Sequence, residues 1–453
     1  MSDAAPLTRE ALVGALSKGI KPKDQWRIGT EHEKFGFDKG SLRRPAYDGP
    51  SGIRAMLEGL QRFGWSPVEE AGHVIALERK NAEGFTASIS LEPGGQFELS
   101  GAPLKDIHDI CSETGQHLVE VKMVADELGL GFLGSGFDPL WSREDVPIMP
   151  KGRYDIMRAY MPKRGQLGLD MMLRTCTIQA NLDFDSEADM VMKFRTSLAL
   201  QPVATALFAN SPFTEGRPNG FLTARANVWT DTDPDRTGML DFVFADGFSF
   251  ETYVDYALDV PMYFTKRDER YVDLSGQSFR AFADGKLDAL PGDRATAKDW
   301  ADHLTTLFPE VRLKQYLEMR GADGGPWSRI CALPALWAGI FYDAPSLAAA
   351  WDLCKDWQIE DHERLRREVT RLGLRAEIGG RSLRDVAVDM VAIARQGLKN
   401  RARFSGGMVD ERGYLSELED TADSGITPAE RLLDLYHGPW AGDVRRLYSD
   451  YAY

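Results

Sequence analysis

Two segments of the chain concentrate carboxylates in a pattern that suits cation binding. They are residues 29–37, Gly-Thr-Glu-His-Glu-Lys-Phe-Gly-Phe, and residues 90–100, Ser-Leu-Glu-Pro-Gly-Gly-Gln-Phe-Glu-Leu-Ser. In an extended strand alternate side chains share a face, so Glu31 lies beside Glu33 and Gln96 beside Glu98. Carboxylates gathered on one sheet face repel each other unless a cation lies among them. Hard divalent cations such as Mg²⁺ prefer oxygen ligands and usually accompany phosphate substrates, which predicts a nucleotide-using enzyme.

Each acidic segment also has a plainer interpretation. Glu31 and Glu33 would suit a solvated strand face, although the two phenylalanines that follow on the same face favour a pocket. Glu92 and Glu98 flank a Pro-Gly-Gly sequence. That sequence either brings the backbone close to a ligand or forms an ordinary bulge or hairpin.

Two further segments place polar side chains at strand spacing. Residues 173–185 alternate apolar and polar side chains, with Gln179 and Asn181 on the polar face. Residues 312–320 alternate as well, and Glu318 shares the polar face with Arg320, either within a site or as an exposed ion pair. We expect four strands of an antiparallel sheet to present one polar face opposite a packed one.

Helices are expected to position these strands. The spacing predicts helices over residues 8–18, 105–128 and 186–210, the last beginning at the N-cap Ser186 and kinked or broken at Pro202. Beyond about residue 344 the sequence predicts an almost wholly helical structure. Because no linker-like segment separates this part, we expect a single catalytic domain over residues 1–453 with a helical C-terminal layer at about 344–453.

The common phosphate-binding loops are excluded by context. Residues 129–134 match GxGxxG, but a predicted helix precedes them where a dinucleotide site needs a strand, so they are expected to end that helix. No GxxxxGK[ST] loop is present. Nucleotide phosphates would then be held by metal ions and arginines. The arginines near the predicted strands are Arg153, Arg158, Arg174, Arg225 and Arg320.

Composition excludes several partners. A net charge of −15 over 453 residues argues against nucleic acid and against an anionic membrane surface. No apolar run is long enough to span a membrane, and residues 1–6 lack the pattern of a signal peptide, so a cytoplasmic location is expected. The four cysteines, Cys111, Cys176, Cys331 and Cys354, are widely spaced and are expected to be reduced thiols.

Several long motifs together resemble one family, the plant-type glutamate–cysteine ligases, which plants share with many proteobacteria. The motifs occur in order at residues 29–36, 91–101, 171–184, 209–216 and 316–327, and the resemblance runs over about residues 10–450. It implies a bacterial member with an α+β fold, in which helices surround a curved antiparallel sheet similar to that of glutamine synthetase and the guanidino kinases.

The resemblance also implies an activity. The expected enzyme is an ATP-dependent carboxylate–amine ligase that joins the γ-carboxylate of L-glutamate to L-cysteine through a γ-glutamyl phosphate. The products are γ-glutamylcysteine, ADP and phosphate, in the first step of glutathione biosynthesis. The expected partners are these small molecules, with no nucleic acid and no membrane, and the expected assembly is a monomer or homodimer.

The matching motifs also assign the site residues. The resemblance places Mg²⁺ ligands, with Mn²⁺ as an alternative ion, at Glu31, Glu33, Glu92, Glu98, Gln179 and Glu318. It assigns the catalytic arginines, which hold glutamate or the transferred phosphoryl group, to Arg225 and Arg320. It assigns substrate binding to Met172, Arg174, Asn181 and Trp229.

The chain differs from the plant members of the family in its cysteines. Plant members carry two disulfides that make activity redox-sensitive; Cys111 and Cys331 occupy the positions of one pair, whereas the other pair's positions hold Leu274 and Ala289. Cys111 and Cys331 therefore form a candidate redox pair, although free thiols are expected in a reducing cytosol. Two other functions stay open: a related ligase with another amine acceptor, and a non-catalytic glutamate or nucleotide sensor on the same fold.

Overall fold

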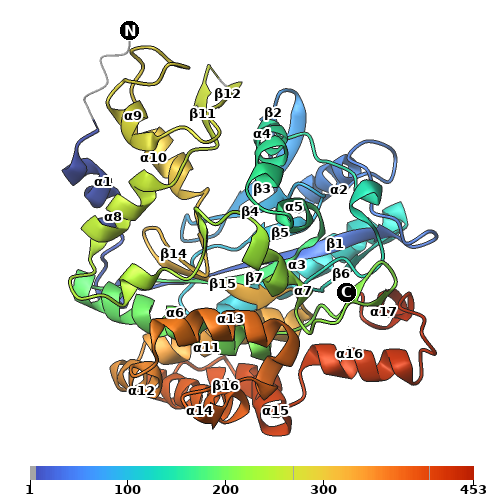
Figure 1. The fold of residues 1–453 in the computed structure, drawn as a ribbon. Coiled ribbons are helices and arrows are strands. Elements are labelled where there is room, and N and C mark those ends of the chain that lie inside the picture. The colour runs from blue at the N-terminus through green and yellow to red at the C-terminus, as the bar shows by residue number, and fades with distance from the viewer. Residues whose placement is uncertain (1–6, 269, 408) are drawn as a thin grey trace.

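A nine-stranded sheet organises the molecule, and every pair of neighbouring strands in it is antiparallel (Figure 1). The computed structural model describes residues 7–268, 270–407 and 409–453. The strand order is β14-β15-β7-β1-β5-β4-β3-β2, and β6 pairs with the far end of β1. The strands are β1 (Ile28–Asp38), β2 (Ser66–Glu70), β3 (His73–Lys80), β4 (Thr86–Leu91), β5 (Phe97–Ser100), β6 (Leu130–Leu133), β7 (Thr177–Leu182), β14 (Val311–Leu313) and β15 (Leu317–Asp323). The predicted α+β class is confirmed.

The register of the central strands brings the acidic motifs together. Glu33 on β1 lies directly opposite Glu98 on β5, and Glu31 lies opposite Gln179 on β7. Because side chains of directly paired residues share a face, these four polar side chains lie on one side of the sheet. The intervening residues His32 and Lys34 point to the other side and are fully buried.

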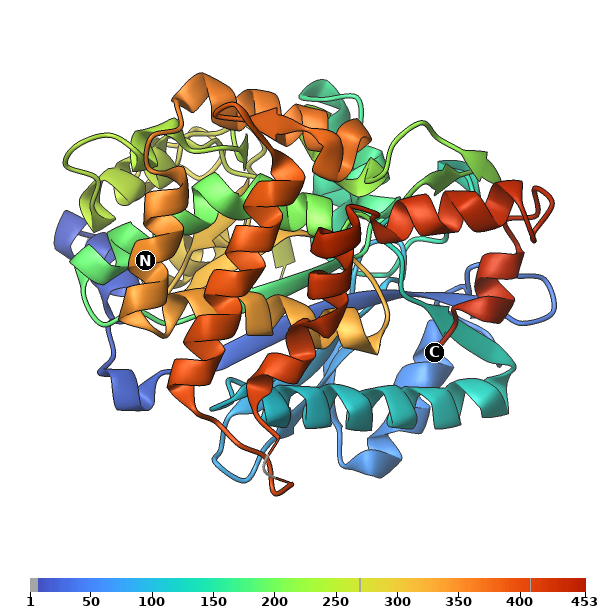
Figure 2. The same cartoon turned by 90° about the horizontal axis from the view of Figure 1, so that it is seen from below.

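Helices cover that other side in two layers. The inner layer is α3 (Ile107–Leu128), α6 (Glu187–Leu207) and α11 (Trp327–Phe341), whose apolar side chains form the main core with β7 and β15. The outer layer consists of α12 (Ala344–Cys354), α13 (Ile359–Leu372), α14 (Leu383–Arg401) and α15 (Ser416–Ser424). Seen from below, these orange and red helices lie across the sheet (Figure 2). This packed layer leaves the acidic face as the open one.

Shorter elements surround the acidic face and the ends of the sheet. The helices are α1 (Arg9–Ser17), α2 (Ile53–Leu60), α4 (Gly152–Tyr160), α5 (Gly168–Arg174), α7 (Ala224–Val228), α8 (Phe250–Asp259), α9 (Phe279–Ala283), α10 (Ala297–Leu304), α16 (Pro428–His437) and α17 (Arg446–Asp450). The two-stranded pairs are β8 (Phe213–Thr214) with β9 (Arg217–Pro218), β10 (Thr237–Gly238) with β13 (Phe308–Pro309), β11 (Phe264–Arg267) with β12 (Arg270–Asp273), and β16 (Glu377–Ile378) with β17 (Arg381–Ser382).

The predicted helices are present with small shifts at their ends. The side chain of Ser186 caps α6 by accepting the backbone N–H of Asp189, as expected. α6 nevertheless continues through Pro202, because the surrounding residues 196–207 are all buried and tertiary packing holds the helix together. Gly129 adopts a left-handed conformation, with φ 71°, and ends α3 as the context of its motif predicted.

Two strand predictions are wrong in extent. Residues 312–320 form a hairpin rather than one strand, because the chain turns at Lys314–Tyr316 between β14 and β15. Residues 173–176 are not part of β7, since α5 runs to Arg174 and the strand begins only at Thr177. In both places the alternation of polar and apolar residues continues through a turn, so spacing alone could not locate the break.

The described helices bear on the membrane prediction. In the described ranges no single helix is long and apolar enough to cross a membrane; α11 and α12 together have the length and composition but meet at a bend of 95°. The absence of a signal peptide was predicted from residues 1–6, which lie outside the described residues.

A disulfide joins Cys111 on α3 to Cys331 on α11. The expectation of free thiols is wrong for this pair, because packing of α3 against α11 brings the two Cα atoms within 5.7 Å, a separation that suits a disulfide. Cys176 and Cys354 are free and buried.

Removing the disulfide should lower stability. The bond joins residues 220 positions apart, and closure of so long a loop in the unfolded chain stabilises the folded state by about 5 kcal/mol in the loop-entropy treatment. We expect Cys331→Ser to lower the urea midpoint, and a reductant to lower the wild-type midpoint to the same value. A wild-type midpoint that does not respond to reductant, with the bond shown intact beforehand by non-reducing peptide mass spectrometry, would contradict this.

Candidate active site

A cavity of about 210 Å³ opens on the acidic face of the sheet. Its floor comes from β1, β5, β7 and β15, and its walls come from α4, α5 and α7 and from the segments at residues 264 and 305–308. The predicted site residues that line it are Glu31, Glu33, Glu92, Glu98, Met172, Gln179, Arg225, Trp229 and Arg320. The fold therefore brings most of the predicted site to one place.

Three predicted residues lie outside this cavity. Arg174 points away from it and pairs with Asp170 and Glu215. Asn181 lines a neighbouring cavity, from which its side-chain amide donates to Glu31. Glu318 is fully buried in the wall between them.

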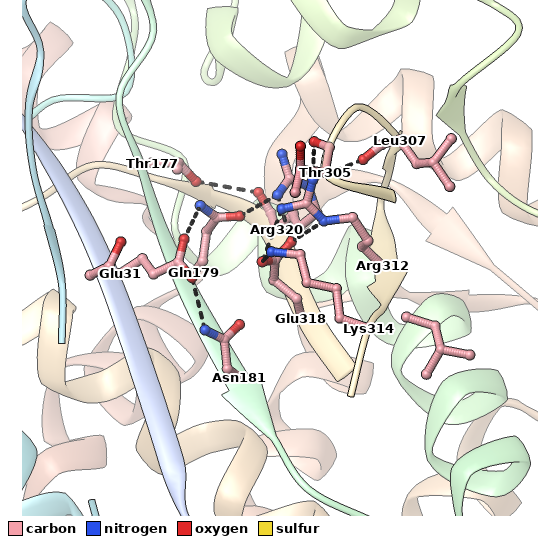
Figure 3. Close-up of polar contacts among 12 residues, drawn as sticks. Glu31, Thr177, Gln179, Asn181, Thr305, Leu307, Arg312, Lys314, Glu318 and Arg320 are labelled. Carbon is pink, nitrogen blue, oxygen red and sulfur yellow. Dashed lines mark hydrogen bonds and ion pairs between the residues drawn. The ribbon is translucent and has the colours of Figure 1, made fainter. Parts of the chain in front are cut away.

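Glu318 is held by three cations (Figure 3). Arg312 donates to both carboxylate oxygens, with Nε 2.6 Å from Oε2 and Nη2 3.0 Å from Oε1. Lys314 Nζ lies 3.2 Å from Oε1 and Arg320 Nη1 lies 2.7 Å from Oε2. These charges hold the pKa of Glu318 well below its usual value despite complete burial. Glu318 thus anchors the basic residues of the wall and has little capacity left for a metal ion.

A chain of hydrogen bonds runs from this ion cluster to the acidic residues. Arg320 Nη1 donates to Gln179 Oε1 at 2.6 Å, which turns the amide nitrogen of Gln179 toward Glu31 Oε2 at 3.0 Å. Asn181 Nδ2 donates to Glu31 Oε1 at 2.9 Å. Burial, followed by the charges of Glu318 and Glu98, raises the pKa of Glu31 to about 7.

Glu33 and Glu98 also resist ionisation. Burial, followed by the charges of Glu92 and Glu98, raises the pKa of Glu33 well above its usual value, although its Oε2 accepts the Thr177 N–H at 3.0 Å. Burial and the charge of Glu92 raise the pKa of Glu98, which accepts the Ser90 hydroxyl at 2.7 Å. A bound cation would relieve this mutual repulsion.

The acidic cluster fits a metal ion shared with a ligand better than a cage made by protein alone. Among residues 7–268, 270–407 and 409–453, no three His, Cys, Asp or Glu side chains converge around one point. Mg²⁺ is usually bound by one or two carboxylates together with water and substrate phosphates, so it does not require such a cage. Glu31, Glu33, Glu92 and Glu98 offer carboxylates of this kind.

Arg225 reaches the cavity from the short helix α7. Its Nη2 donates to the Arg320 carbonyl at 2.7 Å, while its buried Nε has no protein partner. The start of α7 is fixed by the buried Asp323, which accepts the hydroxyls of Ser211 at 2.6 Å and Thr223 at 2.8 Å. Those hydroxyls in turn accept the backbone N–H groups of Arg225 and Ala226. Sequence reasoning did not identify Asp323, because its partners come from distant parts of the chain.

A second cavity of about 490 Å³ adjoins the first and shares Glu31 and Thr305 with it. Lys21, Arg27 and Lys314 contribute positive charge to its lining, and Asp183 contributes negative charge. Two ligands bound in the two cavities would therefore approach each other at Glu31.

Comparisons with known proteins identify the family. The profile of the glutamate–cysteine ligase family 2 (GCS2) matches residues 27–450. The chain belongs to this family. It is 57% identical over 449 residues to the chloroplastic glutamate–cysteine ligase of Arabidopsis thaliana, covering 99% of this chain and 83% of that protein. It is 56% identical over 451 residues to the chloroplastic enzyme of Nicotiana tabacum, covering 99% of this chain and 84% of that protein.

The expected family and enzyme class are thereby confirmed. The fold is shared with the crystal structure of a Francisella tularensis glutamate–cysteine ligase in complex with AMP, with a TM-score of 0.57 at 14% sequence identity over 94% of this chain and 89% of that one. The predicted cytoplasmic location is contradicted, because the matching ligases from tobacco, tomato, Medicago truncatula and Arabidopsis are all named chloroplastic.

Neutralising Glu318 should weaken the fold as well as the site. Glu318→Gln leaves Arg312, Lys314 and Arg320 close together without their counter-charge, and breaking a buried ion pair of this kind costs about 3–5 kcal/mol. We expect a lower urea midpoint. Glu83→Gln is the matched control, because Glu83 is 43% exposed and an exposed pair contributes about 1 kcal/mol or less. Equal midpoints for the two variants would show that the buried cluster does not stabilise the protein.

Glu31 should make stability depend on pH in the presence of a chelator. Its pKa is about 7 in the folded chain against an ordinary value of 4.5, so the folded state binds more protons between these values. Through Glu31 the free energy of unfolding should therefore fall as pH rises from 4.5 to 7, and this contribution levels off above pH 7. Glu33 and Glu98 contribute slopes of the same sign, so Glu31→Gln should reduce the dependence of the urea midpoint on pH without abolishing it. An unchanged slope would contradict the buried, repelled state of Glu31.

Proposed function

We propose that the chain catalyses the ATP-dependent ligation of L-glutamate to L-cysteine, which yields γ-glutamylcysteine, ADP and phosphate. The observation that carries the proposal is one cavity in which Glu31, Glu33, Glu92 and Glu98 face Arg225 and Arg320. This arrangement occurs in a chain that is 57% identical to a curated glutamate–cysteine ligase. On this proposal the reaction is the first step of glutathione biosynthesis.

The proposed chemistry proceeds through an activated carboxylate. A γ-carboxylate oxygen of glutamate attacks the γ-phosphorus of ATP, and the bond to the ADP oxygen breaks. The amine nitrogen of cysteine then attacks the acyl carbon of the γ-glutamyl phosphate, phosphate leaves, and a carboxylate of the acidic cluster takes the ammonium proton. Activation is needed because an unactivated carboxylate would have to expel oxide.

Each group of residues has a proposed part in these steps. Glu31, Glu33, Glu92 and Glu98 would hold Mg²⁺ together with the nucleotide phosphates, and the ion when bound neutralises charge on the transferred phosphoryl group. Arg225 and Arg320 donate hydrogen bonds to that charge from fixed positions. Gln179 and Glu318 hold Glu31 and Arg320 in place through the contacts of the hydrogen-bond chain.

The two cavities suggest where the substrates bind. A nucleotide is much larger than glutamate and fits the cavity of about 490 Å³, which carries Lys21, Arg27 and Lys314. Glutamate fits the cavity of about 210 Å³. Phosphoryl transfer would then take place at Glu31, where both cavities meet.

Product analysis tests the function directly. Purified protein with ATP, Mg²⁺, L-glutamate and L-cysteine should form γ-glutamylcysteine, detected by its mass, with one ADP released per product. Other amines in place of cysteine test acceptor choice. ADP released faster with another amine would indicate a related ligase, and calorimetric ATP binding without ADP formation would indicate a sensor.

Glu31→Gln should remove most of this turnover. The substitution preserves shape but removes a charge that we place at the phosphoryl group, so we expect kcat to fall by roughly 100-fold or more. Glu83→Gln, on the exposed surface, should keep wild-type turnover. Near-normal activity of Glu31→Gln at saturating Mg²⁺ would rule out the assigned role.

A further inference from the structure

Arg153 is a cavity arginine to which neither the family motifs nor the proposed mechanism gives a role. It lies near the start of α4 and lines the 210 Å³ cavity together with Tyr154 and Met157 from the same helix. Arg225 enters the cavity from α7, where its Nη2 contacts the Arg320 carbonyl, whereas the start of α4 is hydrogen-bonded to Leu91, next to Glu92. The two arginines therefore enter the same cavity from different elements.

The guanidinium of Arg153 contacts the Tyr154 side chain but has no carboxylate partner among the residues that the structure describes. Arg312 and Arg320 pair with Glu318, whereas Arg225 donates to a backbone carbonyl and, like Arg153, has a buried Nε without a protein partner. In the described part of the chain no carboxylate forms an ion pair with Arg153, and its Nε is buried without a hydrogen-bond partner. A buried cationic donor without an acceptor is costly unless a ligand supplies one.

The position of Arg153 is nevertheless fixed. Its guanidinium carbon lies 5.2 Å from the centre of the Tyr154 ring. The Tyr154 hydroxyl donates to the Leu91 carbonyl at 2.5 Å, and Lys151 Nζ donates to the same carbonyl at 2.8 Å. Leu91 is the last residue of β4 and directly precedes Glu92. α4 is thereby tied to the strand end that carries Glu92, so a ligand would meet Arg153 in a prepared geometry.

We propose that Arg153 binds the α-carboxylate of the glutamate substrate and so selects an α-amino dicarboxylate. The inference rests on the proposed function. Glutamate carries two carboxylates, and the one that reacts is placed with Arg225 and Arg320, so the other needs a separate cation. A guanidinium offers two parallel N–H groups that match a carboxylate. Met172 and Trp229 line the same cavity and offer apolar contact to the methylene groups between the two ends.

A nucleotide phosphate is a poorer match for Arg153. The nucleotide is placed in the 490 Å³ cavity, which meets the first at Glu31 and Thr305 and is not lined by Arg153. Across the described ranges, the side chains hydrogen-bonded to Glu31 are those of Gln179 and Asn181. Arg153 is thus not among the polar contacts at the point where phosphoryl transfer is placed.

The test compares glutamate with γ-aminobutyrate, which keeps the reacting carboxylate and the amine but lacks the α-carboxylate. We expect Arg153→Ala to raise the KM for glutamate roughly 10- to 100-fold, the loss of a charged hydrogen-bonded pair, with a smaller change in kcat. The KM values for ATP and cysteine should stay unchanged. For γ-aminobutyrate, measured as a slow substrate or as a competitive inhibitor, wild type and variant should behave alike. Arg153→Lys should recover part of the glutamate affinity.

Arg158→Ala is the matched control, because Arg158 lies on the same helix, is exposed, and pairs with Asp155. It should leave every constant at the wild-type value. An equal loss with γ-aminobutyrate, a rise in the KM for ATP or cysteine, or no change with glutamate would each overturn the assignment. If Arg153→Ala does not fold, calorimetric titration of Arg153→Lys with both amino acids decides in the same way. Failure of the wild type to form γ-glutamylcysteine would instead refute the proposed function.

Discussion

The burial of several carboxylates on one sheet face is the constraint on which the site depends. Burial and neighbouring carboxylates raise the pKa values of Glu31, Glu33 and Glu98, so the folded chain holds their charged forms in an unfavourable state. Such a state persists only where the surrounding structure determines it strongly. A cation that enters this cluster gains free energy from charges that the fold has already brought together, which is how a site can be prepared for a metal and its phosphates.

The positive charges that could neutralise the carboxylates gather around one of them, Glu318. Glu318 lies on the same polar face but is neutralised by Arg312, Lys314 and Arg320, so its pKa is depressed while that of Glu31 is raised. Gln179 joins the two carboxylates, accepting from Arg320 and donating to Glu31. One side of the cavity thus presents fixed positive charge and the other presents carboxylates ready for a cation. The phosphoryl transfer that we propose would use both.

The rigidity behind this arrangement comes from the opposite face of the sheet. α3, α6 and α11 bury that face in a continuous apolar core, and the Cys111–Cys331 bond joins two of these helices. On the open side, Asp323 fixes the start of α7 through Ser211 and Thr223, so Arg225 depends on a buried carboxylate that does not reach the cavity. Charged groups can be held a fraction of an ångström from their working positions only when their supports are packed in this way.

Strand periodicity and family motifs in the sequence were sufficient to predict the fold class and the carboxylates that line the cavity, because alternate residues of a strand necessarily share a face. Local pattern could not show that residues 312–320 turn back on themselves, that Glu318 meets three cations, or that Cys111 and Cys331 are bonded. Nor could it distinguish Arg153, which faces the cavity, from Arg158, which is exposed on the same helix. These outcomes depend on contacts between segments far apart in the chain, and the energy of such contacts exists only once tertiary packing has brought the segments together. The sequence therefore determined which groups are available for the chemistry, and the tertiary structure decided which of them remain free to take part.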